Sequence, residues 1–74
     1  MKQTHEILLD DINLTLLGYS PDGEFFWDIN EPFVTIHEWN GKYIFTSTGK
    51  ELNYVSDLQK EYYKFTNKIL TFKK

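Results

Sequence analysis

The stretch "IHEWNGKYIF", residues 36–45, holds the strongest hairpin signal in the chain, an Asn-Gly pair between two runs rich in apolar residues. Asn-Gly favours a two-residue type I′ turn between antiparallel strands. Such a short loop also fixes the register, so that Trp39 pairs with Lys42 and the pairing continues residue by residue away from the turn. We therefore predict strands over 33–39 and 42–47.

A second turn signal, Ser-Pro-Asp-Gly at residues 20–23, lies upstream. Proline presets φ at the second position of the turn, and glycine supplies a positive φ at its end. Strands are therefore expected over 12–19 and 24–29. Asn-Glu-Pro at 30–32 ends the latter strand, because proline cannot donate to a ladder. Beyond the Asn-Gly hairpin, Thr-Gly-Lys at 48–50 is expected to end the sheet.

The last third of the chain changes to a helical period. Ser56 can cap a helix, and Gln59, three residues later, completes a capping box. The apolar residues that follow recur at intervals of three and four and form one stripe: Leu58, Tyr62, Phe65, Ile69 and Phe72. We predict a helix over 57–70 with this stripe facing the sheet.

Together these elements predict an α+β fold, in which a four- to five-stranded antiparallel sheet, built as a meander of hairpins, carries one C-terminal amphipathic helix on one face. Residues 1–74 form a single small domain, because a chain of this length supports one hydrophobic core. The segment 1–11 is ambiguous, since it fits either an extra edge strand or a short helical turn.

The predicted registers divide the side chains of the sheet between two faces. If the first turn is a type I turn with a glycine bulge, Tyr19 lies opposite Phe25. The core face, covered by the helix, is then expected to carry Leu17, Tyr19, Phe25, Trp27, Val34, Ile36, Tyr43 and Phe45. The second face keeps its own large apolar residues: Leu14, Leu16, Phe26, Phe33, Trp39 and Ile44. If half of these six side chains were buried, at about 2 kcal/mol each, the transfer free energy gained would be about 6 kcal/mol, which is comparable with the stability of a small domain.

Three covers for this second face are compatible with the sequence. Residues 1–11 could fold back over it and contribute Ile7, Leu8 and Leu9. A second copy of the chain could pack on it, or a different protein could bind there.

The chain offers few residues for catalysis or metal binding. It has no cysteine, and its two histidines, His5 and His37, lack the spacing of a metal-binding helix. Ser20, Ser47 and Ser56 have simpler roles in a turn, at a strand end and in a helix cap. We therefore expect a protein that is not an enzyme and that holds no cofactor and no metal.

Charge is unevenly distributed along the chain. Residues 1–40 hold one lysine and eight acidic residues, whereas residues 41–74 hold seven lysines and three acidic residues. The asymmetry fits a self-neutralising fold, in which the two halves lie side by side, or a charged partner. One charged option is nucleic-acid binding by a helix face with Lys60, Lys64 and Lys68, which the absence of arginine and the net charge of −3 disfavour. The opposite option is mimicry of nucleic acid by the acidic half.

Composition also bears on origin and location. The chain has no alanine and no arginine but many residues with A/T-rich codons, which favours a low-GC bacterium or its phages. The first residues do not match a signal peptide, and no apolar run has the length of a membrane span. We therefore expect a cytoplasmic protein with no membrane partner.

Binding of another protein, or of a second copy of the chain, is the function that these observations favour. The expected contact surface has Phe26, Phe33, His37, Trp39 and Ile44 at its centre and Asp28, Glu38 and Lys42 at its rim. Buried aromatic rings would act as anchors, and the charges would orient the partner. Small size and composition suggest a phage or mobile-element inhibitor, or an immunity-type protein.

Overall fold

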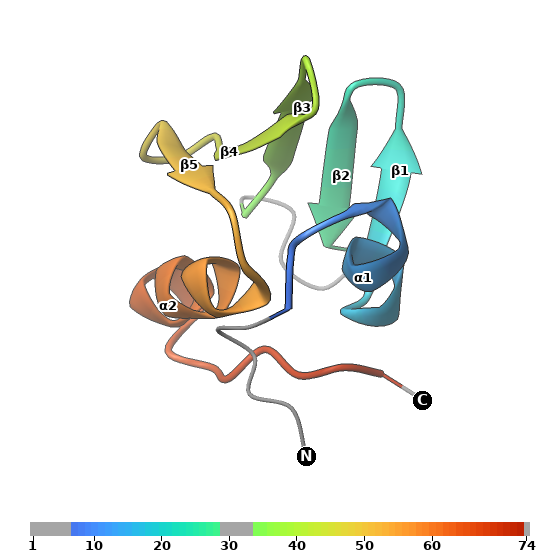
Figure 1. Ribbon diagram of the computed structural model, residues 1–74. Coiled ribbons are helices and arrows are strands. Elements are labelled where there is room, and N and C mark those ends of the chain that lie inside the picture. The colour runs from blue at the N-terminus through green and yellow to red at the C-terminus, as the bar shows by residue number, and fades with distance from the viewer. Residues whose placement is uncertain (1–6, 29–33, 74) are drawn as a thin grey trace.

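The computed structural model describes residues 7–28 and 34–73 and confirms the α+β fold, an open antiparallel sheet with a C-terminal helix (Figure 1). The elements in chain order are α1 (Asp11–Leu16), β1 (Tyr19–Asp22), β2 (Phe25–Asp28), β3 (Ile36–Trp39), β4 (Lys42–Phe45), β5 (Lys50–Leu52) and α2 (Val55–Thr66). The five strands lie in the order β1-β2-β3-β4-β5, so the sheet is a meander in which every strand pairs with its neighbour in the chain.

The β3–β4 hairpin has the predicted register. Trp39 pairs with Lys42 across the turn, and the ladder continues to the pair of Ile36 and Phe45. Asn40 and Gly41 both have positive φ, at 52° and 77°, as a type I′ turn requires.

The register of the β1–β2 hairpin differs from the predicted one. Asp22 pairs with Phe25, so that Gly23 and Glu24 form a two-residue turn with Gly23 at φ +64°. The predicted turn with a glycine bulge is therefore wrong, and the pairing is displaced by an odd number of residues. An odd displacement moves every side chain of β2 to the face opposite the predicted one.

The sheet does not end at residues 48–50. The backbone N–H groups of Thr48 and Gly49 donate to the carbonyl of Phe45, and this turn, with Gly49 at φ +75°, reverses the chain. β5 then pairs antiparallel with β4, and Leu52 lies opposite Tyr43. The sheet therefore has five strands, within the predicted four to five, but the fifth is β5 and not the N-terminal edge strand considered for 1–11. Of that segment, residues 7–11 contribute only an isolated bridge between Leu8 and Tyr54.

The strand predicted over 12–19 is also wrong, because its first part is helical. The carboxylate of Asp10 accepts a hydrogen bond of 2.7 Å from the backbone N–H of Asn13 and caps α1. Leu14 and Leu17, three residues apart, both turn into the core. Gly18, at φ +100°, ends this segment and allows the chain to enter β1.

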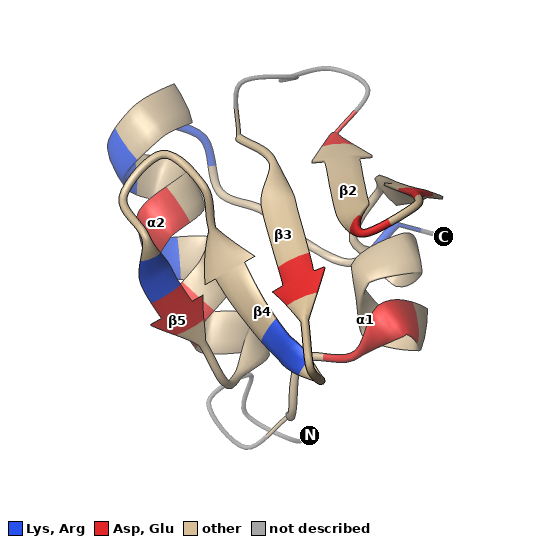
Figure 2. Ribbon diagram, turned by 90° about the horizontal axis from the view of Figure 1, so that it is seen from above, with Lys and Arg blue, Asp and Glu red and all other residues tan. Residues whose placement is uncertain are grey.

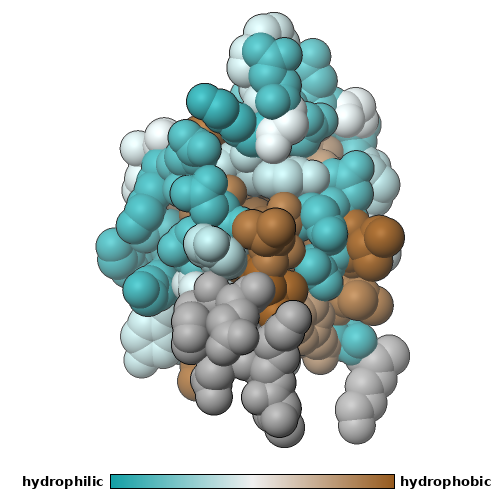
Figure 3. Space-filling view, in the orientation of Figure 1, coloured by the Kyte–Doolittle hydropathy of each residue, from teal (hydrophilic) through white to brown (hydrophobic). Residues whose placement is uncertain are grey.

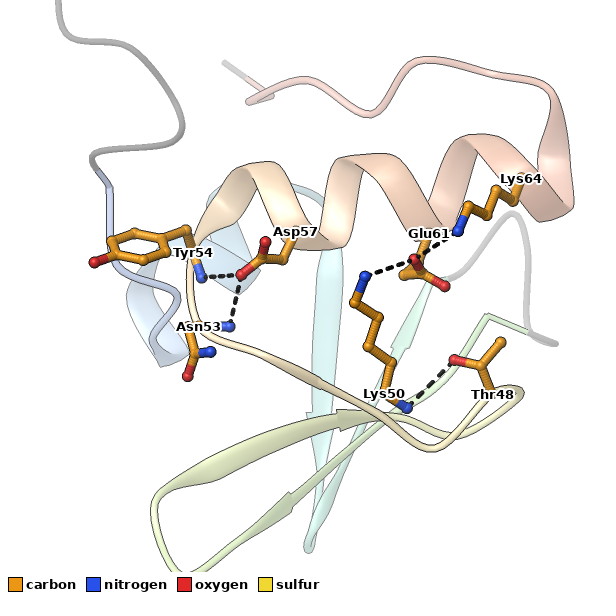
Figure 4. A network of polar contacts seen from close by, with 7 residues as sticks. All are labelled: Thr48, Lys50, Asn53, Tyr54, Asp57, Glu61 and Lys64. Carbon is orange, nitrogen blue, oxygen red and sulfur yellow. Dashed lines mark hydrogen bonds and ion pairs between the residues drawn. The ribbon is translucent and has the colours of Figure 1, made fainter.

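Helix α2 begins two residues earlier than predicted and ends four residues earlier. The cap is not built by Ser56. Instead, the Asp57 carboxylate accepts hydrogen bonds of 3.0 Å from the backbone N–H groups of Asn53 and Tyr54 (Figure 4). Asn67, in the left-handed region at φ 60°, ends the helix.

The core lies between the sheet and a layer formed by both helices, the described residues before α1 and those after α2 (Figure 1). It contains Leu9, Leu14, Leu17, Tyr19, Phe26, Val34, Ile36, Phe45, Leu52, Val55, Leu58, Tyr62 and Leu70. Phe25 and Trp27, predicted in this core, lie outside it because of the changed register. Phe65, Ile69 and Phe72 of the predicted helix stripe are exposed. Ile69 and Phe72 lie beyond the end of α2, so the helix does not direct them toward the sheet.

Candidate protein-binding face

The face of the sheet that points away from α2 carries a group of apolar side chains. Phe25 and Trp27 of β2 are 38% and 39% exposed, and Trp39 of β3 is 56% exposed. His37 of β3 and Ile44 of β4 lie on the same face and are half-buried. We call these five residues the open face. Side chains alternate along a strand, and the neighbours Phe26 and Ile36 point the other way, into the core.

The strand registers align part of the open face into one row across the whole sheet. Phe25 pairs with His37, His37 pairs with Ile44, and these three occupy the middle of the row. Asp22 lies opposite Phe25 at the β1 end, and Glu51 lies opposite Ile44 at the β5 end. The row therefore has an apolar centre and a carboxylate at each end.

Ring contacts order the centre of the open face. The rings of Phe25 and His37 stack with centroids 4.6 Å apart and planes inclined by 21°. Trp39 lies next, with its ring centroid 6.2 Å from that of His37. Nε2 of His37 lies 3.0 Å from Oε1 of Glu24, so this carboxylate orients the imidazole.

The described N-terminal residues do not cover the open face. The backbone N–H of Leu9 donates to the carbonyl of Asn53, and that of Val55 donates to the carbonyl of Ile7. This part of the chain therefore lies against the start of α2, and Leu9 joins the core on that side of the sheet. Residues 7–11 therefore do not provide the fold-back that is one of the three covers considered for the second face, while residues 1–6 lie outside the described part of the chain.

Four residues of the predicted contact surface lie on the face away from α2: His37, Trp39, Lys42 and Ile44. Phe26 and Asp28 do not, because the changed register of β2 turns both into the core. Glu38 points to the helix side of β3, where its carboxylate accepts a hydrogen bond from the backbone N–H of Gly41. Phe33 lies outside the described residues.

Phe25 and Trp27, two aromatic members of the open face, are predicted from the sequence in the core, so the pattern alone does not identify them as surface residues. It also gives no role to Asp22, Glu24 and Glu51. The available signal was the glycine of the first turn, because a glycine can begin a two-residue loop as well as complete a bulge. Reading the turn in that way exchanges the two faces of β2.

Asp28, predicted at the rim, belongs instead to a polar group in the core. The hydroxyl of Tyr62 donates to Asp28 at 2.7 Å, and that of Tyr19 donates to the carbonyl of Val34 at 2.9 Å. Burial raises the pKa of Tyr19, and the nearby Asp28 carboxylate raises it further. These bonds tie β1, β2 and α2 together and explain how a carboxylate is accommodated inside.

A further polar contact joins α1 to the sheet. The hydroxyl of Tyr43 donates to the carboxylate of Asp11. Burial, followed by this hydrogen bond, raises the pKa of Tyr43. Asp10, Asp11 and Glu38 lie around the same shallow depression, so this end of the molecule is acidic.

The lysines of the alternative nucleic-acid face are not in one line on a helix. Lys60 and Lys64 lie on α2, but Lys68 follows the end of the helix. The buried carboxylate of Glu61 lies 3.2 Å from Nζ of Lys64 and 3.5 Å from Nζ of Lys50 (Figure 4). Part of the positive charge is therefore neutralised within the molecule.

Acidic residues predominate on α1, β3 and the β1–β2 hairpin, whereas lysines and acidic residues lie together around α2 and β5, and one lysine lies at the start of β4 (Figure 2). The ion pairs of Glu61 with Lys50 and Lys64 join residues of the C-terminal half, and that of Glu24 with His37 joins residues of the N-terminal half. These pairs do not provide the expected mutual neutralisation of the two halves.

Other exposed apolar side chains lie on the helix side of the molecule, where Figure 3 shows hydrophobic groups over α1 and the segment that leads to it. Leu8, Ile12 and Leu16 form this group, and further exposed side chains lie on α2 or next to it: Tyr54, Tyr63, Phe65, Ile69 and Phe72. Aromatic rings are therefore exposed on both sides, but both tryptophans of the chain belong to the open face, and tryptophan is the side chain most enriched among interface anchors. The open face is therefore the stronger candidate for an anchor site.

Residues 7–28 and 34–73 contain no group of three or more His, Cys, Asp or Glu side chains that could hold a metal ion. In the same ranges, no helix has the length and apolar character needed to cross a membrane.

Comparison of the chain with protein-family models, with curated proteins and with solved structures found no match.

Proposed function

We propose that this protein is a non-enzymatic protein-binding module that acts through the open face. The observation that carries the proposal is the grouping of Phe25, Trp27 and Trp39 on the sheet face away from the core, each at least one-third exposed. Scattered exposed apolar residues are normal, but a contiguous group of rings around an ordered histidine marks an interaction surface.

The aromatic side chains of the open face are partly hydrated, and their burial by a partner is favourable. Each aromatic side chain can bury a large area, and full burial of one such side chain contributes about 1.5–3 kcal/mol. These side chains remain partly in contact with water in the isolated chain. A partner that covers them gains the part of this free energy that corresponds to the area still exposed, and the sheet does not need to rearrange, since the strand ladder already holds the rings and Glu24 orients the His37 between them.

Nucleic-acid binding has less support as an alternative. Stacking rings are present, but the lysines of α2 lie on the other side of the sheet, and Asp22, Glu24 and Glu51 lie near the rings. Carboxylates beside the rings repel a phosphate backbone.

The proposal extends to biological setting. Codon preference inferred from the composition supports a low-GC bacterium or one of its phages, and the absence of cysteine fits the reducing cytoplasm. In that setting, a small module without an enzymatic site would act as an inhibitor or immunity-type protein by occupying a surface of its target.

The experiment compares capture of proteins from a lysate of a low-GC bacterium by the immobilised chain and its variants. We expect proteins that are retained by the wild type to be lost with Trp27→Ala/Trp39→Ala. The matched control is Tyr63→Ala, which removes an exposed aromatic ring from α2, on the other side of the sheet. Retention of the same proteins by the double variant would contradict the proposal.

A further inference from the structure

We infer that the partner of the open face presents an apolar strip between two cationic side chains about 19 Å apart. This inference rests on the proposed function and specifies the chemistry of its partner. The spacing follows from the row of paired residues, because four intervals of about 4.8 Å separate β1 from β5.

The charged side chains around the open face indicate the chemistry of the partner. The row ends in Asp22 and Glu51, both exposed. Glu24, beside His37, adds a third carboxylate. Among the described residues that the registers place on this face, Lys42 is the single lysine, and it lies beside Trp39 rather than in the row. The apolar centre therefore has negatively charged ends, which a complementary partner meets with Lys or Arg.

A second copy of this chain does not meet that requirement. When two sheets pack face to face in the aligned arrangement, their strands remain within about 30° of each other. A two-fold axis along the row then places Asp22 against its own equivalent, and an axis along the strands places Asp22 against Glu51. Each arrangement brings carboxylates together, and like charges across an interface oppose association.

The test uses two flexible synthetic peptides of equal length with blocked ends. Their sequences are Lys-Thr-Leu-Thr-Leu-Thr-Lys and Glu-Thr-Leu-Thr-Leu-Thr-Glu. When extended, each places its terminal charges about 20 Å apart, with both leucines on the same side as the charges. Binding to the full chain is followed by amide chemical-shift changes and by tryptophan fluorescence, which reports on Trp27 and Trp39, the two tryptophans of the chain.

We expect the lysine peptide to bind about tenfold more tightly than the glutamate peptide at low salt, since two exposed pairs attract in one complex and repel in the other. The preference should disappear in Asp22→Asn/Glu51→Gln and reverse in Asp22→Lys/Glu51→Lys. Lys60→Gln, which changes a charge on α2, should leave it unchanged.

Equal affinities of the two peptides for the wild type would overturn the inference, as would absence of binding by either peptide or an unchanged preference in the amide variant. A dimer of the isolated chain in light scattering, dissociated by Trp39→Ala, would also overturn it in favour of a second copy. In each case the proposed function stands if lysate proteins are still lost with Trp27→Ala/Trp39→Ala, and it falls if they are retained.

Discussion

The ring of Phe25 stacks on that of His37 across neighbouring strands, with centroids 4.6 Å apart. The pair lies on the side of the sheet away from the helices, at the middle of the row that runs from β1 to β5. Stacking and the contact with Glu24 hold the imidazole in one orientation. An ordered aromatic surface of this kind loses little conformational entropy when a partner covers it.

The stability of a Trp39 variant distinguishes a surface position of this side chain from a core position. Because Trp39 is 56% exposed, Trp39→Ala should change the free energy of unfolding by less than about 1 kcal/mol. Phe26→Ala, which empties a core position on the other face of the neighbouring strand, should cost about 3–5 kcal/mol. Urea unfolding followed by far-UV circular dichroism measures both, and a loss of several kcal/mol in Trp39→Ala would place this ring inside the protein.

The hydrogen bond between Tyr62 and Asp28 should contribute measurably to stability. Tyr62→Phe removes the hydroxyl that donates to this buried carboxylate, and we expect a cost of about 1–3 kcal/mol. Tyr63→Phe is the matched control, because the side chain of Tyr63 is exposed on the next position of α2. Equal urea midpoints for the two variants would show that the Asp28 contact has no net effect.

The two lysines that contact Glu61 should contribute to the free energy of unfolding in a non-additive way. The Glu61 carboxylate is 2% exposed and contacts both Lys50 and Lys64. Either single Lys→Met change leaves one ammonium in place and should cost less than about 1 kcal/mol. Lys50→Met/Lys64→Met should cost more than the sum of the single changes, about 3 kcal/mol, because it leaves a buried charge without either lysine.

The further change Glu61→Met in that double variant should recover most of the lost stability, since a hydrophobic replacement removes the unpaired charge. Strict additivity of the two lysine changes in urea unfolding would argue against a shared carboxylate.

High pH should destabilise the protein through its buried phenols. Burial raises the pKa of Tyr19 above its ordinary value of about 10. Above that pH the unfolded chain releases a proton that the folded chain still holds, so the stabilisation is complete below about pH 10 and is lost as the pH rises further. Tyr19→Phe should therefore weaken the decrease in unfolding free energy between about pH 9 and about pH 11. An identical decrease in wild type and variant would exclude Tyr19 as a source.

The two hairpins show how far turn chemistry predicts the sheet. Asn40 and Gly41 fit one short loop, and the predicted register of β3 and β4 is correct. Residues 20–23 fit two loops of different length, and the choice between them depends on packing beyond the turn. In the observed register, Phe26 lies in the core beside Ile36, and the carboxylate of Asp28 accepts a hydrogen bond from the hydroxyl of Tyr62. The short-range sequence pattern does not contain that information.

Short elements were the least predictable part of the fold. α1 has six residues, too few to be stable alone, and depends on the burial of Leu14 and on the Asp10 cap. β5 has three residues and depends on its ladder with β4. The excess of apolar surface was evident from the number of large side chains, and it correctly indicated a second apolar face. The identity of its rings required the register of β2.

Acrylamide quenching of tryptophan emission in the isolated chain tests most directly whether the open face is uncovered. Both tryptophans belong to this face, so the whole signal comes from it, and Trp27→Phe and Trp39→Phe separate the two contributions. At concentrations where light scattering gives a monomer, we predict that acrylamide quenches each tryptophan and that the emission lies at longer wavelength than that of a buried indole, because both side chains are partly exposed. Blue-shifted emission and resistance to acrylamide in the monomer would contradict the account, because the rings would then be covered by the chain itself.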